Sequence, residues 1–374
     1  MNGTILYVGN FELPDKGASA NRVVSNGKLF AKLGYGVAYL GVRKQGEREN
    51  VTCLDEEKGM YEEPYPSGLK GWIAHMFSTK NIEAVIEQCG DVCMVILYNT
   101  PFSLLLRAKA VLRKRKIRVV YDCTEWTPDT DGSILKRIVK RMDCYLIKHF
   151  LPKAADGMIV VSSRMKKAYE KDGRVLHLPP LVDLKDDIWH CEKPEKREPF
   201  TFCFAGGLDG NKERLDLIVE AIGELEQGKA LLRIIGVTEE EFCAFYPRGR
   251  ALLHKAQKNV CFMGKRTHRE TMEYVGNCDC VIFIREGDMR NQAGFPTKFV
   301  EAYTCGVSIL TTDVSDVRTY ADESVILIDE VSVDAISKAM SSAVHDIKQE
   351  KRTLNETFHY ETYEECCREW LENN

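Results

Sequence analysis

Short, continuously apolar segments alternate with helical patterns along this chain, and this alternation constrains the fold more than any other feature. Residues 5–8, 37–42, 92–98 and 117–121 have the composition of buried strands, and the patterns at 20–33 and 103–114 are typical of helices. Apolar strands joined by helices require a parallel sheet that is covered on both faces. The sequence therefore predicts an α/β fold.

The same alternation begins a second time after a polar, proline-containing stretch at residues 185–199, which is typical of a linker. Strand patterns then recur at residues 200–205, 231–235, 260–263, 280–284 and 307–311. At 374 residues the chain also exceeds the usual size of one domain. We predict two Rossmann-like domains whose parallel sheets face an interdomain cleft, because ligands bind beyond the carboxyl ends of parallel strands.

Charge and composition exclude several classes of function. A net charge of -4 gives no general attraction to nucleic acid, so we expect no nucleic-acid partner. The 14 cysteines are scattered, without the two-residue gap of redox or zinc motifs, so we expect reduced thiols and no metal site. No apolar run is long enough to span a bilayer, and no leader pattern is apparent, so we expect a cytoplasmic protein.

The densest chemical signal lies at residues 284–302, where a strand pattern is followed by a polar loop and a helix. Gly294 lies in the loop, and Pro296 stands where a helix can begin without losing a hydrogen bond. Free N–H groups at a helix start attract phosphate, Lys298 adds positive charge, and Glu301 can accept hydrogen bonds from sugar hydroxyls. A capped helix with a solvated lysine and glutamate is the alternative interpretation.

A second signal is the glycine-rich turn at residues 205–212. Gly206 and Gly207 allow the backbone to approach an anion closely, and Lys212 can pair with it. The turn that contains Gly17 is similar. Each turn is equally consistent with a purely structural role, because none matches an established phosphate-binding fingerprint.

Together these segments resemble a known family. Residues 294–302, read as Gly-Phe-Pro-Thr-Lys-Phe-Val-Glu-Ala and followed by residues 305–309, look like the donor-site signature of the family 4 retaining glycosyltransferases. Lys212 falls where that family has a diphosphate-binding lysine. The similarity extends over nearly the whole chain and is most specific at residues 200–325. The resemblance implies a GT-B fold, with two Rossmann-like domains.

The resemblance also implies roles for individual residues. Glu301 holds the ribose of the nucleotide, the backbone at Gly294 and Phe295 contacts the pyrophosphate or the sugar, and Lys212 neutralises the departing phosphate. Two positions depart from the family pattern. Ala293 stands where a sugar-contacting glutamate is usual, and Gly207 where an arginine is usual. We expect Arg285, Arg290 or Arg214 to supply the missing positive charge.

The resemblance assigns residues 1–185, with a final helix at 355–374 crossing back, to an acceptor-binding domain, and residues 198–350 to a donor-binding domain. On the acceptor side, the segment 119–126 resembles the place where relatives hold an acceptor-binding or catalytic polar residue. There Asp122 and Glu125 are candidates for orienting an acceptor hydroxyl, and Trp126 for stacking on a sugar. Helix capping and a buried tryptophan are the alternatives.

The candidate site is therefore a set of thirteen residues. As catalytic candidates we take Lys212, Arg285, Glu125 and Asp122, and as substrate-binding candidates Gly17, Gly206, Gly207, Asn291, Gly294, Phe295, Pro296, Lys298 and Glu301. No cofactor is expected beyond the nucleotide sugar as co-substrate. The one Asp-x-Asp motif of the sequence, at residues 129–131, belongs to the predicted acceptor-binding domain and not to the donor-binding domain. We therefore expect catalysis without a metal ion.

The predicted function is transfer of a hexose from a nucleotide-diphosphate sugar to a glycan or lipid-linked acceptor, with retention of configuration, in bacterial surface polysaccharide or glycoconjugate biosynthesis. A nucleotide-sugar epimerase and a non-catalytic nucleotide-sugar-binding partner are the alternatives. Two basic stretches, 107–118 and the amphipathic 134–150, suit contact with the anionic inner face of the plasma membrane, but solvated helix faces are the preferred interpretation.

Overall fold

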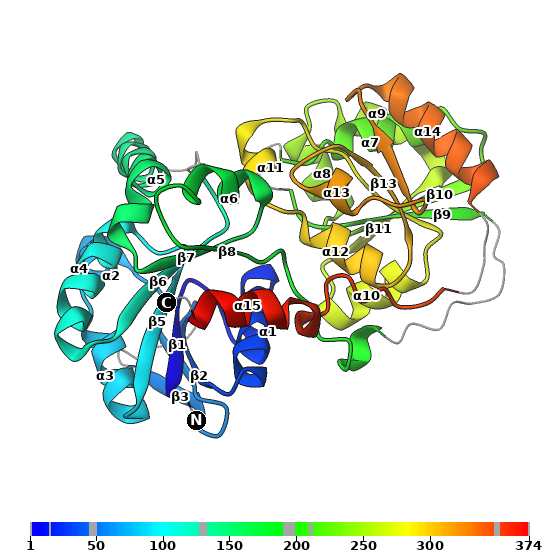
Figure 1. Cartoon of the computed structure of the whole chain (residues 1–374). Helices are drawn as coiled ribbons and strands as arrows, with labels where there is room; N and C mark the ends of the chain where they lie inside the picture. Colours follow the sequence, from blue (N-terminus) through cyan, green and yellow to red (C-terminus); the bar gives the residue numbers. More distant parts are fainter. Residues whose placement is uncertain are drawn as a thin grey trace. The chain divides into compact units, whose positions relative to one another are not determined.

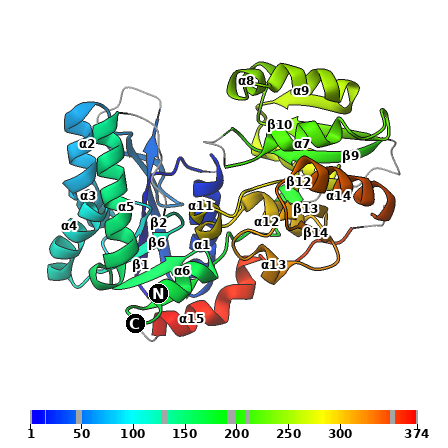
Figure 2. The ribbon, with the colours of Figure 1, turned by 90° about the horizontal axis from the view of Figure 1, so that it is seen from above.

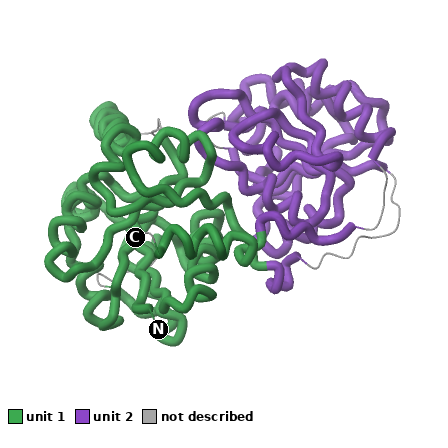
Figure 3. Tube along the Cα trace, viewed as in Figure 1, with its two compact units in different colours: residues 1–183, 359–374 green, residues 184–358 purple. Residues whose placement is uncertain are grey.

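A computed structural model describes residues 2–14, 16–44, 51–126, 133–189, 199–208, 212–347 and 352–372. The chain divides into two compact units (Figure 3). Unit 1 consists of Met1–Asp183 and His359–Asn374, and unit 2 of Leu184–Phe358. The polar stretch expected as a linker lies largely outside the described residues.

Unit 1 is built on an eight-stranded sheet with the order β3-β4-β2-β1-β5-β6-β7-β8. All neighbouring strands are parallel except β3 and β4, which pair antiparallel at one edge. The strands are β1 Thr4–Gly9, β2 Gly36–Arg43, β3 Thr52–Asp55, β4 Met60–Pro64, β5 Val92–Tyr98, β6 Arg118–Cys123, β7 Gly157–Val160 and β8 Val175–His177. The central strands β1 and β5 are buried at all but one residue each, as their continuously apolar sequences predict.

Helices cover both faces of this sheet. They are α1 Ala18–Lys32, α2 Gly68–Phe77, α3 Lys80–Cys89, α4 Phe102–Leu112, α5 Ile134–Ala154, α6 Ser163–Tyr169 and α15 Glu364–Glu372, with short 3-10 turns η1 Arg113–Arg115 and η4 Tyr360–Tyr363. Helices α2, α3, α4 and α5 lie on one face and α1 on the other (Figures 1 and 2).

The final segment of the chain belongs to the core of unit 1. Cys367, Trp370 and Leu371 of α15 are buried in the same cluster as Phe30 of α1 and Tyr7 of β1. Helix α1 also contacts η4. The segment from η4 to α15 therefore packs with the strand and helix that begin the chain.

Unit 2 is built on a six-stranded, wholly parallel sheet with the order β11-β10-β9-β12-β13-β14. Its strands are β9 Phe200–Ala205, β10 Ala230–Ile235, β11 Val260–Gly264, β12 Cys280–Phe283, β13 Ser308–Thr312 and β14 Val325–Ile328. The order turns back at β9, where β10 lies on one side and β12 on the other, and such a switch point places ligands beyond the strand ends.

The helices of unit 2 follow its strands in alternation. They are α7 Leu215–Ile222, α8 Glu239–Phe245, α9 Gly249–Ala256, α10 His268–Gly276, α11 Met289–Ala293, α12 Thr297–Thr304, α13 Val317–Tyr320 and α14 Val333–Asp346, with 3-10 turns η2 Asp187–Trp189 and η3 Gln257–Asn259. Helix α7 packs against α9 and α14, and α10 packs against α12.

The prediction of an α/β fold with two parallel-sheet domains is confirmed. The antiparallel edge strand β3 was not predicted, because only four residues form it and none is buried. In the described part of the chain, no helix is both long and apolar enough to cross a membrane.

Candidate functional site

Glycines end the first three strands of unit 2 and bring their carboxyl ends close together. Gly206, Gly236 and Gly264 follow or close β9, β10 and β11, and the last two have left-handed backbone, with φ values of 97° and 64°. The N–H of Gly236 donates to Gly264, and the N–H of Gly206 donates to Ile235. A Cβ on Gly236 would lie 2.6 Å from the carbonyl oxygen of Gly206. Only glycine fits this junction.

Lys298 lies directly against the turn at Gly206. A Cβ placed on Gly206 would lie 2.8 Å from the Lys298 Nζ atom. The same ammonium lies 4.3 Å from the ring centroid of Phe204, which is cation–π distance. Lys298 belongs to the first turn of α12, so the fold joins the glycine turn after β9 to the helix start about ninety residues later. The two signals found in the sequence thus form one site.

A buried carboxylate connects these elements. Glu213 Oε1 lies 3.1 Å from Lys298 Nζ and 2.6 Å from the Nη2 atom of Arg285, and all three side chains are buried. Burial alone would raise the pKa of Glu213, but Lys298 and Arg285 together outweigh it and lower this pKa to about 2. Two cations face one carboxylate, so the cluster retains one positive charge beneath the strand ends.

Lys212, the candidate diphosphate-binding lysine, is adjacent to this carboxylate in the sequence. Lys212 is half-buried and precedes Glu213, whose pairing with Lys298 ties the 212–214 segment to α12. The backbone N–H of Arg214 donates to Ile284 at the end of β12, which fixes the segment at a second point. The structure therefore brings the Lys212 segment and the Glu301 helix together in unit 2.

Two of the three candidate arginines are held in ion pairs. The guanidinium of Arg285, which was expected to supply positive charge at the phosphate, is buried and bound to Glu213. Arg214 pairs with Asp216 and Glu286 and is about a quarter exposed. Gly207, where the family has arginine, is exposed, and a Cβ there would meet nothing within 4 Å. Space for a longer side chain exists at this position.

Glu301 is held by a neighbour that the sequence analysis did not identify. His268 Nε2 lies 3.1 Å from Glu301 Oε1, and both side chains are about a quarter exposed. His268 is the first residue of α10, which begins with a complete capping box formed by Thr267 and Glu270. This capping signature was the available signal for the position of His268.

The loop before α12 is well fixed. The Asn291 side chain is buried, and its Nδ2 donates to the carbonyl of Glu286, so Asn291 supports the loop from within. Gly294 is extended, and Phe295 is buried among Phe299, Tyr320 and Phe358. Pro296 is the N-cap residue of α12, and no side chain caps the helix. The backbone N–H groups of the first turn of α12 are therefore not capped by the side chain of the N-cap residue.

Ala293, at the position of the family's sugar-contacting glutamate, is fully buried. The structure offers no carboxylate at this position. The Oε2 atom of the buried Glu213 carboxylate has no hydrogen-bond partner. Nothing in the sequence around Glu213 marks it as buried, because charged residues flank it on both sides.

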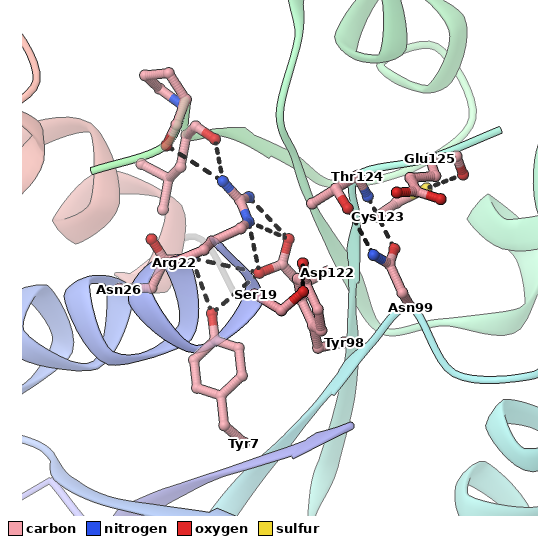
Figure 4. Close-up of polar contacts among 12 residues, drawn as sticks. Tyr7, Ser19, Arg22, Asn26, Tyr98, Asn99, Asp122, Cys123, Thr124 and Glu125 are labelled. Carbon is pink, nitrogen blue, oxygen red and sulfur yellow. Dashed lines mark hydrogen bonds and ion pairs between the residues drawn. The ribbon is translucent and has the colours of Figure 1, made fainter. Parts of the chain in front are cut away.

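In unit 1, the predicted residue Asp122 is the centre of a buried polar network (Figure 4). Arg22 donates to both of its carboxylate oxygens, at 2.8 and 3.2 Å, and also to the carbonyls of Leu178 and Pro179. Asn26 and Tyr7 donate to it as well. Burial raises the pKa of Asp122, although Arg22 opposes the rise. Asp122 is fully buried, so its carboxylate holds Arg22, Asn26 and Tyr7 together within unit 1.

Glu125 is exposed, two residues beyond the end of β6. The segment before it is fixed by Asn99, which exchanges two hydrogen bonds with Thr124 (Figure 4). Trp126 is buried, and its indole donates to the hydroxyl of Tyr169. The expectation that Trp126 stacks on a sugar is therefore wrong.

Gly17 directly precedes α1, with a left-handed φ of 96°, and a Cβ at this position would meet nothing within 4 Å. Arg22 on the same helix was part of the predicted turn, but its ion pair was missed because its partner is 100 residues away. The Asp-x-Asp at 129–131 lies outside the described residues. Within the described ranges, no group of three or more His, Cys, Asp or Glu side chains could hold a metal ion.

Comparison with known families identifies unit 2. Residues 186–358 match the family model described as Glycosyl transferases group 1. The match confirms the resemblance over the segment where the sequence signature is most specific, so unit 2 carries a domain of this family. No curated protein sequence matches the chain.

Solved structures share the fold over the whole chain. Sucrose-phosphate synthase from Thermosynechococcus elongatus matches with a TM-score of 0.69 and 13% identity, covering 99% of this chain and 98% of that one. HepE from Anabaena in complex with UDP matches with a TM-score of 0.69 and 13% identity, covering 99% and 100%. UDP-GlcNAc 2-epimerase from Methanocaldococcus jannaschii has a TM-score of 0.57 and 14% identity, covering 99% and 100%. These similarities establish the GT-B fold.

Proposed function

We propose that this chain, whose unit 2 carries a Glycosyl transferases group 1 domain, transfers a hexose from a nucleotide-diphosphate sugar to an acceptor. One observation carries the proposal. The glycine turn after β9, the Lys212 segment and the first turn of α12 converge on the buried Glu213–Lys298 pair. A diphosphate needs this combination of close backbone approach and positive charge.

The chemistry follows from the charges. Cleavage of a sugar–phosphate bond builds negative charge on the departing diphosphate, so nearby cations and N–H dipoles stabilise the transition state. We assign contact with the diphosphate to Lys212 and to the backbone at Gly206 and Gly294. Lys298 and Arg285 add positive potential from below, and Glu213 fixes their positions.

Glu301 is assigned to the ribose hydroxyls. His268 restricts its carboxylate to one orientation, which reduces the conformational entropy that is lost when a ligand binds. The relative bound to UDP has the same fold, and this supports a nucleotide ligand for unit 2. We infer that transfer proceeds with retention of configuration, that the leaving phosphate oxygen takes up the acceptor proton, and that no metal ion is needed.

On the acceptor side we propose that Glu125 contacts an acceptor hydroxyl, since it is exposed beside a segment that Asn99 and Asp122 hold in place. The acceptor class proposed is a glycan or a lipid-linked sugar, in surface polysaccharide or glycoconjugate synthesis at the cytoplasmic side. This assignment comes from the family resemblance.

The test is product analysis with a panel of nucleotide sugars, with and without glycan and lipid-linked acceptors. We expect acceptor-dependent release of a nucleoside diphosphate that persists in EDTA and is reduced at least tenfold in Lys212→Ala. An altered nucleotide sugar formed without acceptor would indicate an epimerase. The archaeal UDP-GlcNAc 2-epimerase has the same fold. Donor binding without any product would indicate a non-catalytic binding protein.

A further inference from the structure

Helix α5 exposes apolar side chains on the face that points away from the core of unit 1. Ile134, Ile138, Met142 and Tyr145 are 69%, 57%, 60% and 57% exposed. Their spacing of four, four and three residues places them on one face of a helix. The buried residues Ile147, Leu151 and Ala154 occupy the opposite face. An ordinary surface helix has polar residues on the face opposite its buried one.

Basic residues accompany this apolar stripe. Arg137 and Arg141 are exposed and recur one turn apart along its flank. Lys136 is also exposed, but at 3.6 residues per turn it lies on the opposite side of the helix. The only acidic residue of α5 is Asp143, whose carboxylate accepts the N–H of Phe102. The exposed face of α5 is therefore apolar and cationic, without compensating acidic groups on the helix.

Helix α2 repeats the pattern. None of its ten residues is buried, although Leu69, Trp72, Ile73 and Phe77 are all large and apolar. The helix contains Lys70 and no acidic residue. Exposing large apolar side chains to water is unfavourable, so a helix with this composition indicates a surface that binds an apolar partner.

The two helices belong to one surface. Helix α4 packs against both α2 and α5, and exposes Leu106. All three helices lie on the same face of the unit 1 sheet (Figures 1 and 2). The apolar side chains of α2, α4 and α5 thus define one docking surface on unit 1.

We propose that this docking surface binds an anionic lipid bilayer, with the apolar residues inserted at the acyl boundary and the arginines among the headgroups. Apolar insertion combined with positive charge is the recognised pattern of interfacial helices. Trp72 lies edge-on to Tyr65, and such amphipathic rings prefer the headgroup level. The proposal goes beyond sugar transfer and does not depend on the donor site in unit 2.

The charge distribution disfavours a second copy of the chain as the occupant. A two-fold symmetric dimer places the same patch on both subunits, so the basic flank of α5 would face itself. Unpaired like charges at an interface are repulsive, whereas phosphate headgroups neutralise them. An acidic membrane therefore fits this surface better than self-association does.

Vesicle flotation of the full chain without nucleotide sugar tests the proposal. We expect flotation with vesicles of 70% phosphatidylcholine and 30% phosphatidylglycerol, and little with phosphatidylcholine alone. Each basic side chain near the surface contributes about 1 kcal/mol, so Arg137→Gln/Arg141→Gln should weaken partitioning on the order of 30-fold. The matched control in unit 2, Arg250→Gln/Lys258→Gln, changes the net charge equally and should partition normally.

The apolar contribution has its own variant. Ile138→Ser/Met142→Ser should weaken partitioning about tenfold or more, because two large side chains no longer insert. Leu54→Ser/Phe245→Ser removes apolar residues of similar exposure elsewhere and should have no effect. Since all these positions are exposed, unchanged thermal unfolding will establish that the variants are folded.

Trp72 provides a direct signal. The three other tryptophans, Trp126, Trp189 and Trp370, are buried, so a vesicle-induced blue shift and quenching by brominated lipid report on α2. Trp72→Phe should abolish both. Equal binding by the α5 and control variants, no binding to anionic vesicles, or a dimer that the α5 variants dissociate would each overturn the proposal.

Discussion

At the scale of single residues, the site in unit 2 depends on Glu213, the one carboxylate between two buried cations. The ion pair with Lys298 connects the turn after β9 to α12, and the pair with Arg285 connects it to β12. Removing the carboxylate leaves both cations buried without their partner, which typically costs about 3–5 kcal/mol. We therefore expect Glu213→Gln to be markedly destabilised at pH 7, as measured by urea unfolding.

The same carboxylate predicts a pH dependence. Its pKa is lowered from 4.5 to about 2, so in the folded state Glu213 keeps its charge at pH values where the unfolded chain binds a proton. Its contribution to stability is present above about pH 4.5 and is lost as the pH falls towards about 2. Thermal unfolding of Glu213→Gln between pH 5 and 2.5 should vary less than that of the wild type. Equal slopes would show that Glu213 is not held ionised.

Gly207 allows a gain-of-function test. The position is exposed, and a Cβ would meet nothing within 4 Å, so Gly207→Arg should fold normally. If this turn faces the diphosphate, a charge-assisted hydrogen bond worth about 1.5–3 kcal/mol becomes available. We expect nucleoside diphosphate to bind about tenfold more tightly by calorimetry. Gly207→Ala is the control, and a Gly207→Arg affinity no better than this control would place the turn away from the phosphates.

At the scale of elements, strand ends that meet through glycine shape the donor site. Gly236→Ala introduces a Cβ 2.6 Å from Gly206 O at a left-handed φ, and so should displace the turn after β9. Gly228→Ala has a similar φ of 81° with nothing within 4 Å, so it isolates the conformational cost. We expect Gly236→Ala to lower the unfolding temperature of unit 2 more than Gly228→Ala does and to weaken nucleotide binding. Matching losses would mean that the junction tolerates a side chain.

Elements with a regular pattern of buried residues could be predicted from the sequence, and elements without one could not. Strands such as β5 and β10 were predicted within a residue, because a strand covered on both faces has a continuously apolar sequence. Helix α12 was located by Pro296 and its polar loop. The antiparallel pair of β3 and β4 was missed, since its short strands gain their stability from the sheet edge and not from local pattern.

Site residues could be predicted where they belong to a short sequence motif. The Lys212 turn and the Glu301 helix carry recognisable spacing, and His268 follows a capping signature. The Arg22–Asp122 pair and the Glu213 cluster were not predictable, because their members lie between 72 and 100 residues apart and only the fold joins them. The burial of Trp126 and Asp122 was likewise not predictable, because burial depends on the tertiary structure.

At the scale of the whole molecule, the two units have distinct assignments. Unit 2 matches the group 1 glycosyltransferase family, whereas unit 1 carries the docking surface and the exposed Glu125. The expectations that unit 1 binds the acceptor, and that the two sheets face a shared cleft, remain predictions. A bound nucleotide should therefore stabilise unit 2 more than unit 1. Hydrogen exchange measures this as slower exchange of the β9 and α12 amides when nucleotide is present.

Calorimetric titration of UDP, GDP and ADP into the wild-type chain and Lys212→Ala tests the central claim most directly, with the exposed unit 2 residue Lys338→Ala as the matched control. We predict that one nucleotide binds the wild type and the control equally. Loss of a charge-assisted contact worth about 1.5–3 kcal/mol should weaken its binding to Lys212→Ala roughly 10- to 100-fold. Equal affinity of all three proteins, or no binding by any, would contradict a diphosphate held between the Lys212 segment and the start of α12.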